Sequence, residues 1–381
     1  MIKRRLYTPG PTPIPPEAAL AMAQPIDYHR SEEFRRIVGE IEDGLRYVYQ
    51  TTSDVAVLAS SGTGAMECAV VNLFSPGDTV IGIRSGKFGE RWGELATAYG
   101  LDFVPIDLEW GQSVEPETVR RTLDAHPRAK GVLATLCETS TGALHDIESL
   151  GKIIESRDAL LVVDAVSALG ADEIRMDAWR VDALVSCSQK GLMTPPGLGF
   201  CSFGERALEA SKTSRLPKYY FSYAKAIKSL GQNETPYTPA VSLLYGLHTA
   251  LGMIRAEGIE AVWNRHARMA RATVAAVKAL GLTLFPTRPA NTLTSIRVPE
   301  GFDGKALVRR IRSEQGAVFA GGQDHLAGKI VRIAHLGWMD DYDALVAVAA
   351  LERGLLDSGW RVPAGVGVAA AQAALASKES I

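Results

Sequence analysis

Short apolar runs alternate with amphipathic segments along the first half of the chain. Seven of these runs predict strands, at residues 54–60, 78–84, 101–107, 129–136, 159–165, 181–188 and 199–204. Several are continuous rather than alternating, as expected for strands covered on both faces. Helix candidates lie between most of them, and one segment before the first strand carries apolar residues at helical spacing: Phe34, Ile37, Val38, Ile41, Leu45 and Val48. Strand and helix in turn predict an α/β fold with a mostly parallel seven-stranded sheet covered by helices.

The pattern changes after residue 203, where a polar, aromatic segment leads into a long helical stretch from about 240 to 280. Shorter strands follow at 282–285, 292–298 and 329–335, with helices near 303–315 and 341–358. We therefore expect an N-terminal segment (1–20), a large domain (21–255) and a smaller C-terminal α+β domain (256–365). Residues 366–381 are alanine-rich and poor in large apolar side chains, which predicts a loosely held tail.

The composition is typical of a globular protein with a sizeable core, since 46% of the 381 residues are hydrophobic and 22% are charged. The net charge of -2 gives no indication of a nucleic-acid or anionic-membrane surface. No apolar run is long enough to span a bilayer, and the basic N-terminus lacks the apolar stretch of a signal peptide. The four cysteines show no metal-ligand spacing, so we expect no metal site and a reducing, cytoplasmic compartment.

Two ionisable residues follow apolar runs. Lys190 stands before a Pro-Pro-Gly turn in SCSQKGLMTPPGLGF, and Asp164 ends a run in LVVDAVSALG, with Val166 on the same side of an extended chain. Taken singly, Lys190 is explained as a solvated loop lysine and Asp164 as the cap of a turn. Both residues, however, come where strands of a parallel sheet end, which is the edge where ligands bind. A lysine for a Schiff base and an acid for a ring nitrogen are what pyridoxal phosphate requires, so the pair favours this cofactor.

The stretch LASSGTGAMECAVVNL places Thr63 and Gly64 between a predicted strand and a helical pattern. Glycines permit close approach, and the N–H groups at a helix N-terminus attract an anion such as phosphate. Similar turns are common in α/β folds that bind no phosphate. The stretch therefore supports the cofactor only together with Lys190 and Asp164.

Eight segments in a fixed order resemble class V, fold-type I aminotransferases of the alanine–glyoxylate and serine–glyoxylate group. They are TPGPTPIPP, SSGTGAMECA, GKFGERW, ETSTGALHDI, VVDAVSALG, SCSQKGLMTPPG, NETPYTPAVSLLYGL and GKIVRIAHLG. The match runs almost end to end, and the eight together are far more specific than any one of them. The resemblance implies a pyridoxal-phosphate enzyme that moves the amino group of a small amino acid to a 2-oxo acid such as glyoxylate or pyruvate.

The resemblance also implies roles for individual residues. Lys190 would form the Schiff base and move the proton, and Asp164 would pair with the ring nitrogen. Val166 and Phe88 would pack on the two ring faces, although Phe88 is equally well explained as a core aromatic. The remaining cofactor contacts would come from Gln189, Thr63 and Gly64 at the phosphate, and from Thr139 near the ring hydroxyl unless that threonine only shapes its turn.

The segment NETPYTP matches one that crosses between subunits in the family, which implies a homodimer with shared active sites. Thr235 is the candidate contact to the phosphate of the neighbouring site, with Tyr237 and Thr238 as further candidates. The chain lacks the Tyr-His-His-Thr form found in some relatives. An ordinary proline-rich loop is the other interpretation of this stretch.

Two further residues are implied to contact the substrate. Arg332, in KIVRIAH, matches the arginine that binds the substrate α-carboxylate, a task that suits a bidentate guanidinium. Without the resemblance, an arginine on an alternating strand is expected to face solvent. Gly10, in TPGPTP, would let the N-terminal segment approach the substrate and would leave room only for small side chains.

Other functions remain open on sequence alone. An aspartate transaminase of the same family needs a second cation, for which Lys3, Arg4, Arg5 and His335 are candidates. A lyase or a cysteine desulfurase has the same fold, but a desulfurase needs a cysteine in the small-domain region and the last one is Cys201. A partner subunit without catalysis is disfavoured by the presence of the lysine, the aspartate and the arginine described above.

Overall fold

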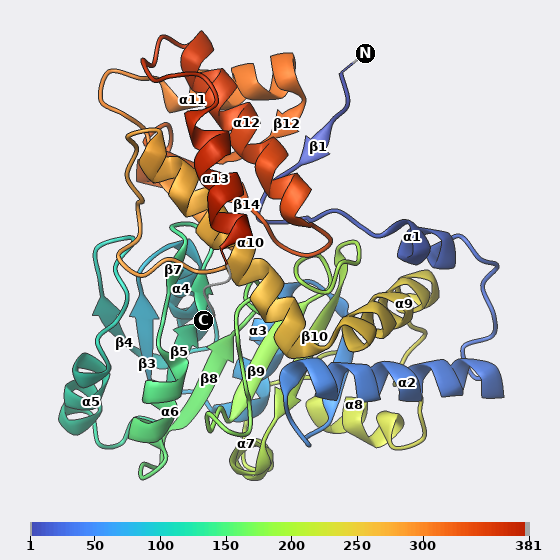
Figure 1. Ribbon diagram of the computed structural model, residues 1–381. Coiled ribbons are helices and arrows are strands. Elements are labelled where there is room, and N and C mark those ends of the chain that lie inside the picture. The colour runs from blue at the N-terminus through green and yellow to red at the C-terminus, as the bar shows by residue number, and fades with distance from the viewer. Residues whose placement is uncertain (1, 378–381) are drawn as a thin grey trace.

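A seven-stranded sheet forms the centre of the computed structural model, which describes residues 2–377 (Figure 1). The strands lie in the order β2, β10, β9, β8, β5, β3, β4, and only β10 runs antiparallel to its neighbours. Their bounds are Val55–Ser60 (β2), Thr79–Arg84 (β3), Asp102–Asp107 (β4), Gly131–Thr135 (β5), Leu160–Asp164 (β8), Ala183–Cys187 (β9) and Gly197–Phe203 (β10). The predicted α/β fold with its mostly parallel sheet is confirmed.

Helices cover both faces of this sheet, as the continuous apolar runs predict. In β8 alternate residues serve different cores: Leu161 and Val163 belong to one, Leu160 and Val162 to the other. The first core is closed by α2 (Glu32–Tyr49), α5 (Pro116–Ala125), α6 (Ile147–Ile154) and α9 (Val241–Glu257), and the second by α3 (Gly62–Leu73), α4 (Lys87–Ala98), α7 (Glu205–Ser211) and α8 (Tyr223–Leu230). Within residues 2–377 no helix is both long and apolar enough to cross a membrane.

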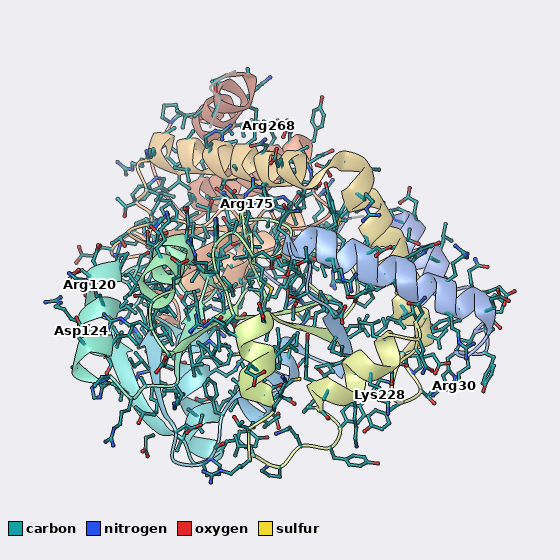
Figure 2. The ribbon with its side chains drawn as sticks, turned by 90° about the horizontal axis from the view of Figure 1, so that it is seen from below. Arg30, Arg120, Asp124, Arg175, Lys228 and Arg268 are labelled. Carbon is teal, nitrogen blue, oxygen red and sulfur yellow. The ribbon has the colours of Figure 1, made fainter. Side chains whose placement is uncertain are left out.

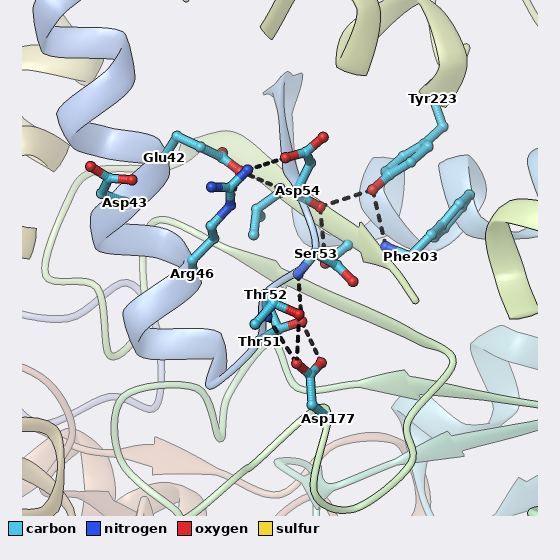
Figure 3. Close-up of polar contacts among 12 residues, drawn as sticks. Glu42, Asp43, Arg46, Thr51, Thr52, Ser53, Asp54, Asp177, Phe203 and Tyr223 are labelled. Carbon is cyan, nitrogen blue, oxygen red and sulfur yellow. Dashed lines mark hydrogen bonds and ion pairs between the residues drawn. The ribbon is translucent and has the colours of Figure 1, made fainter. Parts of the chain in front are cut away.

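A polar cluster fixes α2 to the start of β2 (Figure 3). The buried Glu42 accepts a hydrogen bond from the N–H of Val55 at 2.9 Å, and Arg46 forms ion pairs with Glu42 and Asp54. The carbonyl of Asp54 accepts a hydrogen bond from the hydroxyl of Tyr223 at 2.8 Å. Burial raises the pKa of Glu42 to about 7. These contacts hold one end of β2, whose other end leads into α3.

Gly258 divides the helical stretch that the sequence predicts from about 240 to 280. Its φ of +90° lies in the left-handed region, so α9 ends there and α10 (Ile259–Ala279) starts in a new direction. Helix α9 packs on α1 (Pro16–Met22) and α2, whereas α10 packs on α12 (Asp341–Asp357) and α13 (Val366–Ala376). The predicted helical stretch is therefore present as two helices joined at Gly258.

The C-terminal part of the chain forms the predicted smaller α+β unit, coloured orange to red in Figure 1. Its antiparallel sheet joins β11 (Leu293–Arg297), β14 (Ile330–Ala334) and β13 (Ala320–Gly321), and α11 (Gly304–Arg310) continues into a π-helical turn at Ile311–Gln315. Ion pairs bind α10 to its surroundings: Arg175 reaches Glu260 at 3.1 Å, and Arg268 reaches Asp341 at 3.0 Å. Both arginines are labelled in Figure 2.

The N-terminal segment is held on this smaller unit. Strand β1 (Arg5–Leu6) pairs in parallel with β12 (Ala317–Val318), and the N–H of Ala334 donates to the carbonyl of Tyr7 at 2.9 Å. Further along, the hydroxyl of Thr12 donates to the carbonyl of Lys190 at 2.9 Å. The segment between these contacts, which contains Gly10, therefore crosses from the smaller unit to the end of β9.

The C-terminal segment differs from the expected loosely held tail. Residues Val366–Ala376 form α13, where Ala371 is fully buried against Ala272, Ala276 and Val348 of α10 and α12. Small side chains on the facing helices allow a close approach, so the absence of large apolar residues does not prevent packing. The rest of the predicted tail includes residues 378–381, which lie outside the described part of the chain.

This packing predicts that Ala371→Leu destabilises the protein, because the added methylene groups have no space between α10, α12 and α13. We expect a loss of about 1–3 kcal/mol in the free energy of unfolding. Ala373→Leu, on the exposed face of the same helix, is the control and should change it by less than about 0.5 kcal/mol. Urea unfolding measures both variants. Equal stability of the two would mean that α13 is not packed in solution.

Candidate active site

A pocket of about 230 Å³ lies where β8 and β9 end, at the carboxyl edge of the parallel strands. Most residues that the sequence nominates line this pocket together: Gly10, Thr63, Phe88, Thr139, Asp164, Val166, Gln189 and Lys190. They come from the N-terminal segment, from α3 and α4, and from the turns after three strands. Gly64 and Arg332 lie near the pocket without lining it, and Thr235, Tyr237 and Thr238 lie elsewhere in this chain.

The amine of Lys190 is held by neutral acceptors. Its Nζ donates to the hydroxyl of Ser167 at 3.2 Å and to the carbonyl of Pro9. Burial lowers the pKa of Lys190 from its ordinary value, and the opposing effect of the Asp164 charge is smaller. The free amine is therefore available at a lower pH than on a solvated lysine. An amine in that state is a nucleophile toward a carbonyl compound.

Asp164 is the acidic group of the pocket. It is 4% exposed, and its Oδ1 accepts a hydrogen bond from the N–H of Val166 at 2.7 Å. The carboxylate therefore caps its turn and lines the pocket at the same time. Burial raises the pKa of Asp164 to about 6, and the negative charge of Glu138 adds to this rise. A positively charged ligand group beside Asp164 would favour the carboxylate form.

Residues at the start of α3 line the pocket. The hydroxyl of Ser61 caps the helix, and the first N–H groups of an α-helix have no partner within the helix. Gly62 is required for packing here, because a Cβ at this position would lie 2.6 Å from Cγ2 of Val166. Thr63 lines the pocket, and Gly64 is buried behind it against Ser60. A phosphate or carboxylate at this helix end would meet N–H donors and the positive end of the helix dipole.

Arg91 is a pocket residue that the sequence analysis does not nominate. Its guanidinium carbon lies 4.9 Å from the centre of the Phe88 ring, and its Nη1 donates to Oγ1 of Thr63 at 3.2 Å. The signal lies in the segment GKFGERW, where Arg91 follows Phe88 by three positions and shares its helix face. Ser167, directly after Val166, is a second pocket residue that the sequence analysis does not nominate.

Arg332 is buried behind the pocket at the centre of β14. It is 6% exposed, and its Nε and Nη2 donate to the carbonyl of Gly321 at 2.9 and 2.7 Å. Its Nη1 donates to the carbonyl of Thr139 at 2.7 Å. Burial lowers the pKa of Arg332 to about 10, which still leaves it cationic at neutral pH. The arginine is thus a buried cation beside a pocket residue, not a solvent-facing strand residue.

The segment around Thr235 lies away from this pocket. The hydroxyl of Thr235 donates to the carbonyl of Tyr237, and the ring of Tyr237 stacks on Tyr220 at 5.0 Å. Thr238 lines a separate apolar hollow with these residues. Among the candidates for a second cation, His335 is buried and its pKa is lowered to about 4 by burial, so it is neutral at pH 7. None of the four candidates lines the pocket of this chain.

The fold and this pocket define the class of protein. Residues 17–334 match the family model for class-V aminotransferases, and the chain belongs to this family. Within the described residues, no three His, Cys, Asp or Glu side chains gather as metal ligands.

Individual relatives cover almost the whole chain. It is 42% identical over 380 residues to a protein named soluble hydrogenase, small subunit, from Synechococcus sp., covering 98% of this chain and 99% of that one. It is 40% identical over 375 residues to the L-aspartate–glyoxylate aminotransferase of Paracoccus denitrificans, covering 96% and 95%. The solved structure of an alanine–glyoxylate aminotransferase from Nostoc sp. superposes with a TM-score of 0.89 at 33% identity, covering 93% and 96%.

Gly10 gives a direct prediction about the amine. Its φ is +139°, and a Cβ at this position would lie 2.5 Å from Cε and 2.6 Å from Nζ of Lys190. Gly10→Ala should therefore displace the amine and lower its reductive methylation by about tenfold. Peptide mass spectrometry after treatment with formaldehyde and borohydride measures this. Gly100→Ala is the control, because Gly100 also has a positive φ but has open space around it. Equal labelling of Lys190 in both variants would contradict the proposed close contact.

Proposed function

We propose that this chain is a pyridoxal-phosphate-dependent transaminase. It moves the amino group of a small amino acid, such as alanine or serine, to a 2-oxo acid such as glyoxylate or pyruvate. The observation that carries the proposal is the meeting of Lys190 and Asp164 in one buried pocket at the carboxyl edge of the sheet. The aminotransferase names of two relatives support glyoxylate as the acceptor.

The pocket residues fit the cofactor. Among the described residues the buried Oε1 of Gln189 has no hydrogen-bond partner, and the first N–H groups of α3 are free of helical bonds. The cofactor's ring nitrogen would face Asp164, and its phosphate would lie at the start of α3 beside Thr63 and Gly64. Phe88 and Val166 would form the walls on the ring faces. When bound, the cofactor supplies an electron-withdrawing ring that stabilises negative charge on the substrate's α-carbon.

Lys190 would move the proton at the α-carbon of the substrate. A base must be unprotonated before it accepts a proton, and burial favours that form of Lys190. The carbonyl of Pro9 and the hydroxyl of Ser167 orient the amine, and Ser167 is itself hydrogen-bonded to Thr139. Asp164 would hold the proton on the ring nitrogen, because a carboxylate stabilises the positive charge there.

Arg332 would bind the α-carboxylate of the substrate. A guanidinium has five N–H groups, and three of them donate to the carbonyls of Gly321 and Thr139. Two N–H groups remain for a carboxylate, which is the number that a bidentate contact uses. The carbonyl contacts would orient the guanidinium before the substrate arrives, and Thr139 links it to the pocket wall.

We further propose a homodimer with shared active sites in the cytoplasm. The segment with Thr235, Tyr237 and Thr238 lies away from the pocket of its own chain, so it would contact a phosphate only in a neighbouring subunit. Tyr219 beside it is 72% exposed, which is typical of an aromatic residue that a partner covers. The four cysteines are free, which supports a reducing compartment.

Two alternatives have support of their own. The name of the Paracoccus relative favours aspartate as the donor. The name of the Synechococcus relative favours a role as a subunit of a larger assembly. An aspartate transaminase would still use Lys190, Asp164 and Arg332. A subunit without catalysis would not convert an amino acid at all, and the first experiment below separates these cases.

The first experiment follows the half-reaction with L-alanine, L-serine, L-aspartate and glycine. Protein loaded with pyridoxal phosphate should lose the visible absorbance of the cofactor with at least one of these donors. Asp164→Asn should keep bound cofactor but react about a hundredfold to a thousandfold more slowly, because a neutral amide does not stabilise the ring cation. No reaction with any amino donor would contradict the proposed activity, and wild-type rates in Asp164→Asn would remove Asp164 from the mechanism.

Arg332→Ala tests the carboxylate contact. The variant should keep the bound cofactor and its colour, and should lose about 2–5 kcal/mol in kcat/KM. The loss should be similar for every donor, since all share the α-carboxylate, and Arg332→Lys should restore only part of it. Arg297→Ala, on the neighbouring strand β11 with an exposed side chain, is the control. A loss confined to aspartate would instead assign Arg332 to the side-chain carboxylate.

A further inference from the structure

Glu138 is a fully buried carboxylate beside the pocket. Its Oε2 accepts hydrogen bonds from the N–H groups of Phe88 at 3.1 Å and Gly89 at 2.8 Å. Its Oε1 accepts from the N–H of Ser140 at 3.2 Å and from the hydroxyl of the same serine. All of these donors are neutral, so the carboxylate is solvated by the start of α4 and by its own turn.

The chain is folded tightly around this carboxylate. A Cβ on Gly86 would lie 2.5 Å from both Cγ and Cδ of Glu138, and 2.4 Å from Oγ of Ser140. The N–H of Lys87 also donates to Oγ of Ser140, at 3.0 Å. Burying a carboxylate costs free energy unless it is fully hydrogen-bonded. A cap for α4 alone would not require a buried charge, because an exposed serine or aspartate performs the same task.

The position of Glu138 connects two walls of the pocket. Through its hydrogen bonds it fixes the backbone of Phe88, whose ring lines the pocket on one side. Through the peptide that follows, it fixes Thr139, whose carbonyl accepts the hydrogen bond from Arg332. Its charge also favours the cationic form of Arg332 and opposes ionisation of Asp164. The hydrogen bonds of Arg332 go only to carbonyls, so Glu138 supplies negative charge that its direct partners do not.

We propose that Glu138, as a carboxylate, is a positioning residue. It holds the Phe88 wall and the Thr139–Arg332 contact in fixed positions relative to each other across the pocket. This inference rests on the proposed function, because these relative positions matter only if a cofactor and an amino acid bind in the pocket. Glu138 itself does not line the pocket and touches no reacting atom.

The test compares Glu138→Gln with Ser140→Ala. Glutamine keeps the length of the side chain but removes the charge and turns an amide N–H₂ group toward backbone donors. Ser140→Ala keeps the glutamate and removes one hydroxyl donor, whose hydrogen bond lowers the pKa of Glu138 against the effect of burial. Thermal unfolding of the three proteins establishes that each is folded before the two readouts below are compared.

The first readout is the affinity of the cofactor-free protein for pyridoxal phosphate as a function of pH. In the wild type the affinity should weaken as the pH falls below about 6, because Asp164 then gains a proton and no longer pairs with the ring cation. Glu138→Gln should shift this weakening of affinity to lower pH, since removing a nearby negative charge lowers the pKa of Asp164. Ser140→Ala, which keeps the glutamate, should cause a smaller shift. Arg91 and Lys190, the other charged groups that act on Asp164, are unchanged in both variants.

The second readout is the KM for several amino donors. Glu138→Gln should raise it for every donor by about tenfold to a hundredfold, with a smaller change in kcat, because a displaced Arg332 weakens the α-carboxylate contact. If Glu138→Gln does not fold, Glu138→Asp replaces it. In that variant the pH dependence of the cofactor affinity should stay unchanged while KM rises. If both the pH dependence of the cofactor affinity and the KM match those of the wild type, the proposal is overturned. A wild type that binds no pyridoxal phosphate at any pH overturns the proposed function instead.

Discussion

The partly buried amine of Lys190 donates its hydrogen bonds to neutral acceptors, and the rest of the site is organised around this constraint. A carboxylate in contact with the amine would stabilise the ammonium form and keep the lysine unreactive. The carbonyl of Pro9 and the hydroxyl of Ser167 hold the amine without that effect. Burial acts in the opposite direction on Asp164, whose pKa is raised. Both groups are thus poised to change their protonation state when a ligand arrives.

Maintaining this arrangement requires contacts between segments that are distant in the sequence. The N-terminal segment is bound to the smaller C-terminal unit through β1 and Tyr7, and it contacts Lys190 through Pro9 and Thr12. Gly10 then allows the backbone to approach the lysine side chain, and Gly62 allows α3 to approach Val166. The polar contacts of Glu42 at the start of β2 hold the strand that leads into α3. The sheet therefore sets the positions of the acid and the amine, while the two ends of the chain complete their surroundings.

The sheet and the central pair of residues were predictable from the sequence. Strands buried on both faces leave continuous apolar runs, and Asp164 and Lys190 mark the ends of two of them. Arg91 and Ser167 lie in segments that had been singled out, but their partners, Thr63 and Lys190, are known only once the helices and turns are placed. The break at Gly258 was missed because an apolar pattern continues across it, and α13 was missed because alanines pack well only against another surface of small residues. The proposed role of Thr235 depends on a second chain, which one sequence does not describe.

The central claim is that Lys190 is the amine to which the cofactor becomes attached. Incubation with pyridoxal phosphate, reduction with borohydride and proteolytic digestion would locate the attached mass by mass spectrometry. We expect one modification per chain, on the peptide that contains Lys190, with the exposed Lys130 unmodified at the same cofactor concentration. A modification on a different lysine, with the Lys190 peptide unchanged, would contradict it.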